Sequence, residues 1–281
     1  GLLWVIIHFL VIAGLAAQTG PGGVGNINGD NGQPELLFWL NADSLSLSDN
    51  DNVDVWNDLS GNGYDFSQAQ TSEQPIFQTS VINNHPAIAF DGSDMSLIDE
   101  DGESYFNGLD GFSFFAVVQS EVINTDAGFF DAEDPDNRDD LFAVRYDDSG
   151  ANGGGDDVIK IGTRTGNGEV QIESSENIQT TSPQVVSAQW ADGEGIQLFV
   201  DGNADALTDD GGTLSGTTTN ATKLIIGKGP KDGGGSWNGK IAEVFLFAEA
   251  LNSASRNVLE NYISQKYAIT IPNDYFSTGD P

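Results

Sequence analysis

Short apolar segments, each bounded by Gly, Asn, Asp or Ser, recur along most of the chain. In residues 53–58 apolar and polar side chains alternate, which is the pattern of a strand with one buried face. Residues 112–119 are the longest aromatic-rich segment and predict a central strand. Residues 184–190 and 195–200 flank a short turn and predict a hairpin. The predicted strands are residues 35–41, 53–58, 86–90, 112–119, 141–146, 158–162, 184–190, 195–200, 224–227 and 240–247.

One segment near the end of the chain has the period of a helix. Asn252 is the predicted N-cap residue, because an Asn side chain accepts a hydrogen bond from the first helical turn. Val258, Tyr262, Ile263 and Tyr267 then fall on one face and form the predicted buried stripe. The chain is therefore predicted to be all-β with one short C-terminal helix.

The beginning of the chain resembles a secretory signal. Residues 2–15 are almost wholly apolar and small residues follow them. This apolar run is shorter than the ~20 residues of a bilayer span, so no membrane span is expected in the mature form. The alternative is a retained hydrophobic segment that docks on another surface. The predicted division is a signal-like segment (1–17), a Gly- and Asn-rich linker (18–34), the sandwich (35–272), and a tail or linker to a further part of the protein (273–281).

The charge balance excludes several partners. Of the 281 residues, 43 are acidic and 10 basic, which gives a formal net charge of −33. Such a surface repels the phosphates of nucleic acids and of anionic membranes, so no nucleic acid is expected as a partner. It attracts hard cations such as Ca²⁺, which prefer oxygen ligands. The sequence has no cysteine, so disulfides and thiolate metal sites are excluded.

Six segments carry a wider resemblance. They are residues 37–43 (Leu-Phe-Trp-Leu-Asn-Ala-Asp), 55–63, 89–94 (Ala-Phe-Asp-Gly-Ser-Asp), 112–119, 196–202 (Ile-Gln-Leu-Phe-Val-Asp-Gly) and 237–267. In this order they resemble the laminin-G-like domains of the concanavalin A-like lectin/glucanase superfamily, as found in secreted surface proteins of Bacteroidota. The resemblance implies two stacked antiparallel sheets in a jelly-roll sandwich. Because this superfamily includes glycosidases, lyases, lectins and adhesion modules, the fold alone does not give a function.

The chain lacks the carboxylate pattern that the resemblance would require of an enzyme. Glycosidases use two carboxylates about 5 to 10 Å apart, and hydrolases with this sandwich carry them as Glu-x-Asp-x-Glu on one strand. Glu169 and Glu173 occupy the outer positions, but Gln171 stands where the Asp would be. An exposed strand face is therefore expected there. Glu243 is expected to point outward or to pair with Lys240. We predict no catalytic residue and no enzymatic activity.

Acidic loops are the candidates for a calcium site. Residues 131–140 contain five Asp and one Glu, which repel one another unless a cation or solvent screens them. A second tight turn, at residues 91–94, has an Asp at each end. Ca²⁺ is therefore the cofactor that the sequence suggests, and the alternative for each loop is a solvated acidic turn. The candidate ligands are Asp91, Asp94, Asp131, Asp134 and Asp136.

Aromatic residues near loops are the candidates for ligand binding, because an aromatic ring can stack on the face of a sugar. Tyr64, Tyr146 and Trp237 lie beside loops or strand ends. For Trp237 the resemblance also implies packing in the core or at its rim, since the family has a structural aromatic residue there.

The sequence thus predicts a non-catalytic, secreted or surface-displayed module for adhesion or glycan recognition. Its partner would be a glycan, a cell-surface polymer or copies of itself. One alternative is a structural subunit of an extracellular filament or surface layer, assembled through the hydrophobic N-terminus or an exposed sheet edge. A second alternative is a polysaccharide-degrading enzyme, which the absent carboxylate pattern disfavours.

Overall fold

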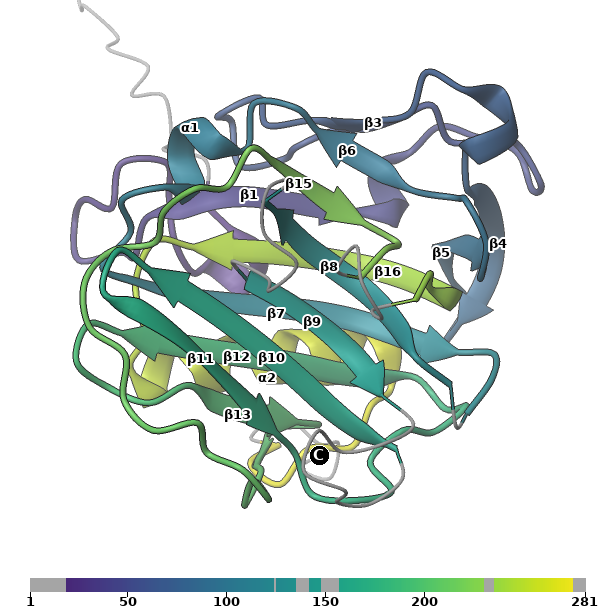
Figure 1. The fold of residues 1–281 in the computed structure, drawn as a ribbon. Helices are drawn as coiled ribbons and strands as arrows, with labels where there is room; N and C mark the ends of the chain where they lie inside the picture. Colours follow the sequence, from purple (N-terminus) through teal and green to yellow (C-terminus); the bar gives the residue numbers. More distant parts are fainter. Residues whose placement is uncertain (1–18, 124, 135–141, 148–156, 230–234, 275–281) are drawn as a thin grey trace, which may run out of the picture.

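Two antiparallel sheets lie face to face in the computed structural model, which describes residues 19–123, 125–134, 142–147, 157–229 and 235–274 (Figure 1). The back sheet has the order β14 (Asn203–Ala204), β13 (Gln197–Val200), β12 (Gln184–Ala191), β7 (Gly111–Ser120), β16 (Asn238–Phe247), β5 (His85–Asp91) and β4 (Ile76–Ile82), and β1 (Leu36–Asn41) also pairs with β16. The front sheet has the order β11 (Gly168–Glu173), β10 (Val158–Thr165), β9 (Phe142–Asp147), β8 (Ala127–Glu133), β15 (Lys223–Ile226), β6 (Leu97–Asp99), β3 (Phe66–Ser67) and β2 (Val55–Trp56). The predicted all-β sandwich is confirmed.

Strand β7 is central, as its apolar sequence predicted. It lies between β12 and β16, and almost all of its residues are buried. Phe112 and Phe114 face the front sheet and pack on Phe142, with ring centroids 4.4 and 5.5 Å apart. Phe115 faces the other way, onto the second core beneath the C-terminal helix. A strand buried on both faces reads as a continuous apolar run, which is why residues 112–119 stand out.

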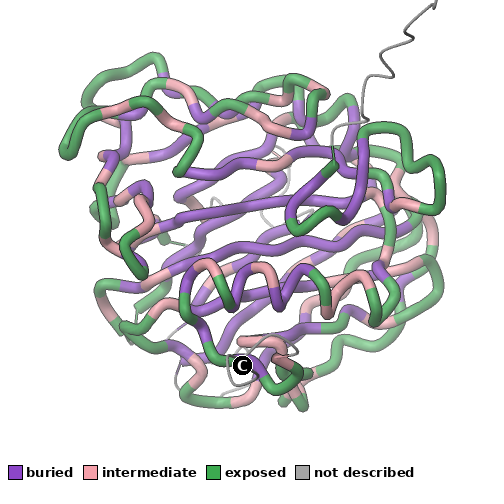
Figure 2. Tube along the Cα trace, turned by 180° about the vertical axis from the view of Figure 1, so that it is seen from behind, coloured by how far each residue is buried: buried purple, intermediate pink, exposed green. Residues whose placement is uncertain are grey.

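Helix α2 (Ser253–Tyr267) covers the outer face of the back sheet (Figures 1 and 2). The predicted cap is confirmed, since the Asn252 side chain accepts a hydrogen bond from the Ser255 N–H at 3.0 Å. The predicted stripe is wrong at Val258, whose side chain is 44% exposed. Leu259 is buried in its place, because each residue turns the helix by about 100° and the inward stripe runs through Leu259, Ile263 and Tyr267.

The segment expected as a linker packs on the sandwich. Pro21 lies in a 3₁₀ turn (Pro21–Gly23) and is buried with Val24. Gly22 has φ +59°, and a Cβ there would lie 2.9 Å from the Cβ of Tyr262 on α2. Only glycine meets both conditions without strain. Residues 19–34 therefore form part of the folded unit, whereas the signal-like residues 1–17 lie outside the described residues.

The remaining helical elements are short. They are α1 (Glu103–Phe106) and 3₁₀ turns at Ala42–Ser44 and Thr71–Glu73. No helix among the described residues has both the length and the apolar character that crossing a membrane requires.

Candidate functional site

The loop of residues 58–64 is held in one conformation by two of its own side chains. The Asn62 amide donates to the carbonyl oxygens of Leu36 and Leu37, at 2.9 and 2.8 Å. The loop is therefore fixed to the first two residues of β1 without a ligand being bound. The carboxylate of Asp58 accepts hydrogen bonds, at 2.8 to 3.2 Å, from the backbone N–H groups of Trp39, Ser60, Gly63 and Tyr64.

Tyr64 ends this loop as a partly exposed aromatic ring. It stacks on Tyr105 of α1, with ring centroids 3.8 Å apart and planes 19° from parallel. Tyr105 is itself buried, and its hydroxyl donates to the Asp99 carboxylate at 2.7 Å. The Tyr64 ring thus rests on a fixed support, which is the arrangement that a stacking contact with a ligand needs.

Carboxylates surround this ring. Burial raises the pKa of the Tyr64 hydroxyl, and the nearby charges of Asp99, Glu35 and Asp58 raise it further. The hydroxyl therefore keeps its proton in neutral solution and is a hydrogen-bond donor. No ion pair joins these carboxylates to a cation within the part of the chain that the structure describes.

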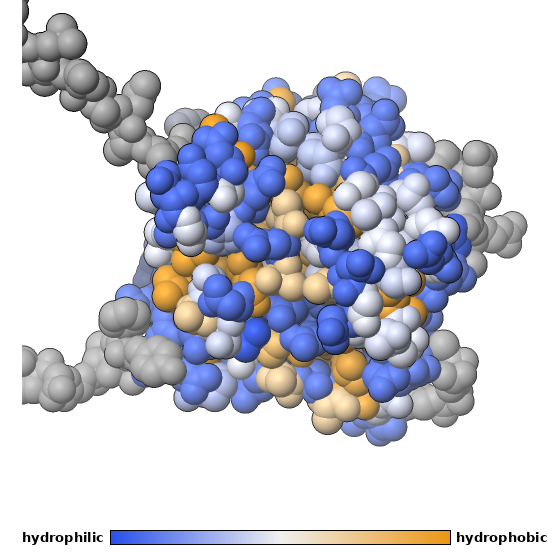
Figure 3. Space-filling model, turned by 90° about the vertical axis from the view of Figure 1, so that its left-hand side faces the viewer, coloured by the Kyte–Doolittle hydropathy of each residue, from blue (hydrophilic) through white to orange (hydrophobic). Residues whose placement is uncertain are grey.

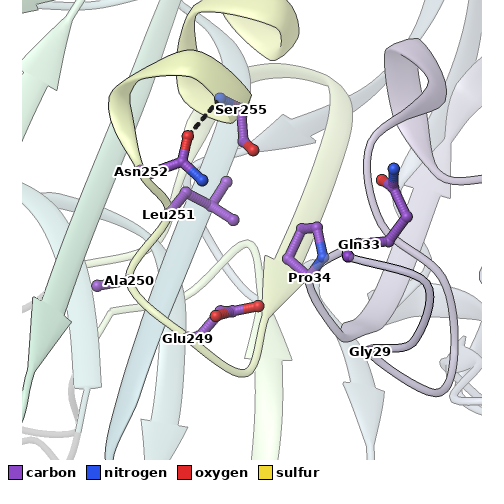
Figure 4. Close-up of a pocket in the computed structure, with 9 residues that line it drawn as sticks. Gly29, Gln33, Pro34, Glu249, Ala250, Leu251, Asn252 and Ser255 are labelled. Carbon is purple, nitrogen blue, oxygen red and sulfur yellow. Dashed lines mark hydrogen bonds between the residues drawn. The ribbon is translucent and has the colours of Figure 1, made fainter.

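A pocket of about 400 Å³ lies at the same end of the sandwich (Figure 4). Pro34 lines it and directly precedes Glu35, which acts on Tyr64. In Figure 4 Glu249, Leu251 and Asn252 line one side, and Pro34 and Gln33 lie on the other. The lining is mostly polar: a carboxylate (Glu249) and two amides (Gln33 and Asn252) lie beside the apolar Pro34 and Leu251. These polar groups can hydrogen-bond a polar small molecule.

The end of the sandwich that carries α1 is mostly hydrophilic, with apolar patches near its middle (Figure 3). β1 and β7 begin at this end and β16 finishes there, as the pairing of Leu36 with Phe247 and of Phe247 with Ser113 shows. The Tyr64 ring and the Figure 4 pocket therefore belong to one loop surface, which we call the α1 end.

Tyr146 and Trp237 are buried, which corrects their prediction as ligand-binding residues; for Trp237 it agrees with the core packing that the resemblance implied. Tyr146 is 1% exposed and Trp237 is fully buried, and the two rings stack with centroids 5.8 Å apart between the sheets. The Tyr146 hydroxyl is used inside the protein, where it donates to Gln184 at 3.0 Å. Neither ring offers a face to a ligand. Of the three aromatic candidates, only Tyr64 reaches the surface.

Neither of the two predicted calcium loops forms a cluster of ligands among the residues that the structure describes. Asp91 is exposed at the end of β5 in the back sheet, where it accepts hydrogen bonds from Ser93. Asp131 is 2% exposed in β8 of the front sheet, and Asp134 lies 3.9 Å from Arg164. Asp94 is exposed, and Asp136 lies outside the described residues. Within the described ranges no group of three or more His, Asp or Glu side chains is placed to hold a metal ion. Calcium stays a prediction.

Glu243 differs most from its expected role. It is fully buried, and its pairing with Lys240 was wrongly predicted, because Lys240 pairs with Glu121 instead. Its two oxygens accept four hydrogen bonds, from Trp39 Nε1 (2.6 Å), Tyr262 OH (2.9 Å), Tyr267 OH (2.8 Å) and Lys266 Nζ (3.0 Å). Three of these donors come from α2, so the carboxylate joins the helix to the back sheet.

The network around Glu243 extends to the surface. Lys266 Nζ also lies 3.0 Å from Asp43, whose carboxylate lies 3.0 Å from His85 Nδ1. Burial alone would raise the pKa of Asp43, but Lys266 and His85 beside it bring that pKa below its usual value. Since Asp43 is partly exposed, this outer part of the network adds less stability than the buried Glu243 contacts.

The carboxylates of β11 are held by cations on β10. Glu173 is 4% exposed, contrary to the expected exposed face, and lies 3.8 Å from Lys160. Glu169 pairs with Arg164 across the same two strands. These contacts are cross-strand ion pairs that stabilise the front sheet.

Comparison with known proteins gives a family and a fold. A family model described as the concanavalin A-like lectin/glucanases superfamily, of the laminin G type, matches residues 90–255. No curated protein matches the chain. Nothing in the comparisons bears on the predicted link to Bacteroidota.

Three solved structures illustrate the likeness. The binding domain of Paraclostridial mosquitocidal protein 1 has a TM-score of 0.55 at 16% identity, over 82% of this chain and 52% of that one. Domain 4 of the extracellular arabinanase AbnA from Geobacillus stearothermophilus, in complex with arabinotriose, has a TM-score of 0.53 at 15% identity, over 81% and 98%. Botulinum neurotoxin type C, whose cell entry depends on two ganglioside molecules, has a TM-score of 0.55 at 14% identity, over 80% and 50%. The chain spans about half the length of the first and third structures, and all three show a shared fold.

Proposed function

Because the match over residues 90–255 shows that this chain belongs to the concanavalin A-like lectin/glucanases superfamily, we propose that it binds glycans through its α1 end. The observation that carries the proposal is the Tyr64 ring, partly exposed and stacked on the buried Tyr105 at 3.8 Å. A ring fixed in this way loses little conformational freedom on binding, which favours affinity. The Figure 4 pocket supplies hydrogen-bonding groups at the same end for the ligand's hydroxyls.

The charge around Tyr64 favours neutral glycans. Asp99, Glu35 and Asp58 lie close enough to raise the pKa of its hydroxyl, and the whole chain carries a formal net charge of −33. Carboxylated sugars would be repelled by this field. The arabinanase domain in complex with arabinotriose shows that a domain of this fold can hold a neutral glycan.

The proposed role is recognition without catalysis, in a protein that is secreted or displayed on the cell surface. The signal-like residues 2–15 support the location. Glu169 and Glu173 are paired with Arg164 and Lys160, and Glu243 accepts four hydrogen bonds, so these carboxylates have structural partners, which supports a role without catalysis. Partners other than a glycan, among them copies of this chain, belong to the alternative of a structural subunit.

The test is a glycan array that contains neutral and sialylated oligosaccharides, followed by calorimetry on the best ligand. Tyr64→Ala is expected to weaken binding about tenfold or more, since an aromatic contact and its buried area are lost. Val258→Ala removes another exposed side chain, on α2, and serves as the matched control. Binding that is unchanged by Tyr64→Ala, or a ligand set made up of sialylated glycans, would refute the proposed site.

A further inference from the structure

A second pocket, of about 430 Å³, lies at the opposite end of the sandwich from Tyr64. It opens between the connection from β11 to β12 and the turn from β13 to β14. We infer that this pocket is a separate binding site for a neutral, hydroxyl-rich ligand such as one sugar residue. Its lining residues are Ser175, Asn177, Ile178, Thr180, Gln184, Val200, Asp201, Asn203, Ala204 and Asp205.

Strand pairing places this pocket far from the α1 end. The Asp201 carboxylate accepts a hydrogen bond from the Val185 N–H at the start of β12, and Val185 pairs with Val117 near the end of β7. Tyr64 belongs instead to the loop whose Asn62 is hydrogen-bonded to Leu36 at the start of β1, and Glu35 acts on its hydroxyl. The two sites are therefore at different ends of the sandwich, and a change in one leaves the contacts of the other in place.

The walls of the pocket are tied together by hydrogen bonds. The backbone N–H and the hydroxyl of Ser175 on one wall donate to Asp205 on the other, at 2.7 and 2.6 Å. Gln184 at the base donates to the carbonyl oxygen of Ile178 at 3.1 Å and accepts from the buried Tyr146 hydroxyl at 3.0 Å. The pocket is thus formed before a ligand binds, so little ordering opposes binding.

Asp201 supplies the main acceptor. With Gly202 it forms the turn after β13, and both residues have positive φ (49° and 71°), as in two-residue hairpin turns. One carboxylate oxygen accepts from the Val185 N–H at 2.9 Å, and the other has no hydrogen-bond partner among the described residues. That second oxygen is available to a ligand hydroxyl, in a charge-assisted hydrogen bond.

The other lining residues fit the two kinds of surface on a sugar. Ile178, Val200 and Ala204 form apolar wall for its C–H groups, and Asn177 and Asn203 add amides for its hydroxyls. None of the described residues that line the pocket is a lysine or arginine, so a sulfate or carboxylate on the ligand would meet Asp201 uncompensated by them. This selects for a neutral ligand.

The test uses arabinotriose, maltotriose and cellotriose as neutral probes and sialyllactose as an anionic one. Amide chemical shifts of the intact chain are recorded by NMR during each titration. At least one neutral probe is expected to shift the amides of residues 177, 203 and 205, and sialyllactose is expected to leave them in place. Asp201→Asn keeps the turn and the bond to Val185 but removes the charged acceptor, so it should weaken this binding about tenfold.

Two further variants keep the test decisive. Asn177→Gly removes a lining side chain and allows the positive φ of 59°, so it should also weaken binding at this pocket. It provides the test if Asp201→Asn fails to fold. The inference rests on glycan recognition as the proposed function, but Tyr64→Ala should leave these shifts intact. The inference is overturned if no neutral probe shifts these amides, or if both pocket variants bind as the unmodified chain does.

Discussion

Replacing Glu243 by alanine is expected to lower the free energy of unfolding by about 3–5 kcal/mol, the usual cost of breaking a buried ion pair from one side. The carboxylate is fully buried and accepts four hydrogen bonds. Its loss leaves three neutral donors without their partner, on the buried Tyr267 and on the half-buried Trp39 and Tyr262. An unsatisfied buried donor costs about 1–3 kcal/mol, and the two half-buried donors cost less because water can reach them. Lys266 keeps its ion pair with Asp43 at 3.0 Å, and water entering the space restores part of the lost hydrogen bonding. The total loss of unfolding free energy therefore stays near the bottom of the range that the three donors would give together.

The assay is urea unfolding followed by tryptophan fluorescence and far-ultraviolet circular dichroism. Glu169→Gln is the matched control, because this glutamate is also ion-paired but its side chain is 48% exposed, and a loss below about 1 kcal/mol is expected. A double variant, Glu243→Leu with Lys266→Met, should lose less than the sum of its parts, since no buried charge is left without a partner. A loss for Glu243→Ala no larger than that of the control would refute this reasoning.

Three further outcomes follow from contacts described above. Gly22→Ala should cost about 1–3 kcal/mol in unfolding free energy, because of the positive φ and the close Tyr262 Cβ. Gly23→Ala shares the positive φ (+81°) but its Cβ would meet nothing within 4 Å, so equal melting temperatures for the two variants would contradict the part assigned to the Tyr262 contact. Burial raises the pKa of Glu260 from 4.5 to about 7, although Arg256 opposes this shift. The folded state therefore binds the proton more tightly than the unfolded state, and stability should fall as pH rises from about 4.5 to about 7. Glu260→Gln should reduce this pH dependence, measured as the difference between the urea midpoints at pH 5 and pH 8. Asn62→Ala should weaken glycan binding several-fold by releasing the Tyr64 loop from β1, and calorimetry beside a melting curve would separate this from general unfolding.

The sequence predicted β7, β12, β16 and the helix because their signals are local, but it missed β8 (Ala127–Glu133), whose end was taken as part of an acidic loop. The apolar composition of residues 112–119 by itself indicates a buried strand. Asn252 caps α2 through a hydrogen bond to Ser255, only three residues away. β4 was missed, since its polar Thr79 and Ser80 interrupt the apolar pattern and it ends the sheet at one edge. The same limit applied to Val258, where a shift of one residue moves the buried face of the helix.

The site could be predicted only in part. Tyr64 and Tyr146 both lie beside a turn in the sequence, so the sequence predicts the same exposure for both. Only the packing of the two sheets shows that Tyr146 is buried. Glu243 could not be assigned its role, because the donors that satisfy it come from Trp39, more than two hundred positions away, and from α2. The fold family was accessible from short motifs in order, whereas the environment of each polar side chain was not.

The position of β16 also sets the order in which this protein can fold. It is the last strand in the sequence, yet it lies inside the back sheet, paired with β7 on one side and with β1 and β5 on the other. Until residue 247 has left the ribosome, β7 and β5 have no shared neighbour and each presents an open edge. The sandwich is therefore expected to close only after residue 247 has emerged, and slowly, through contacts between residues some two hundred positions apart such as Leu36 and Phe247.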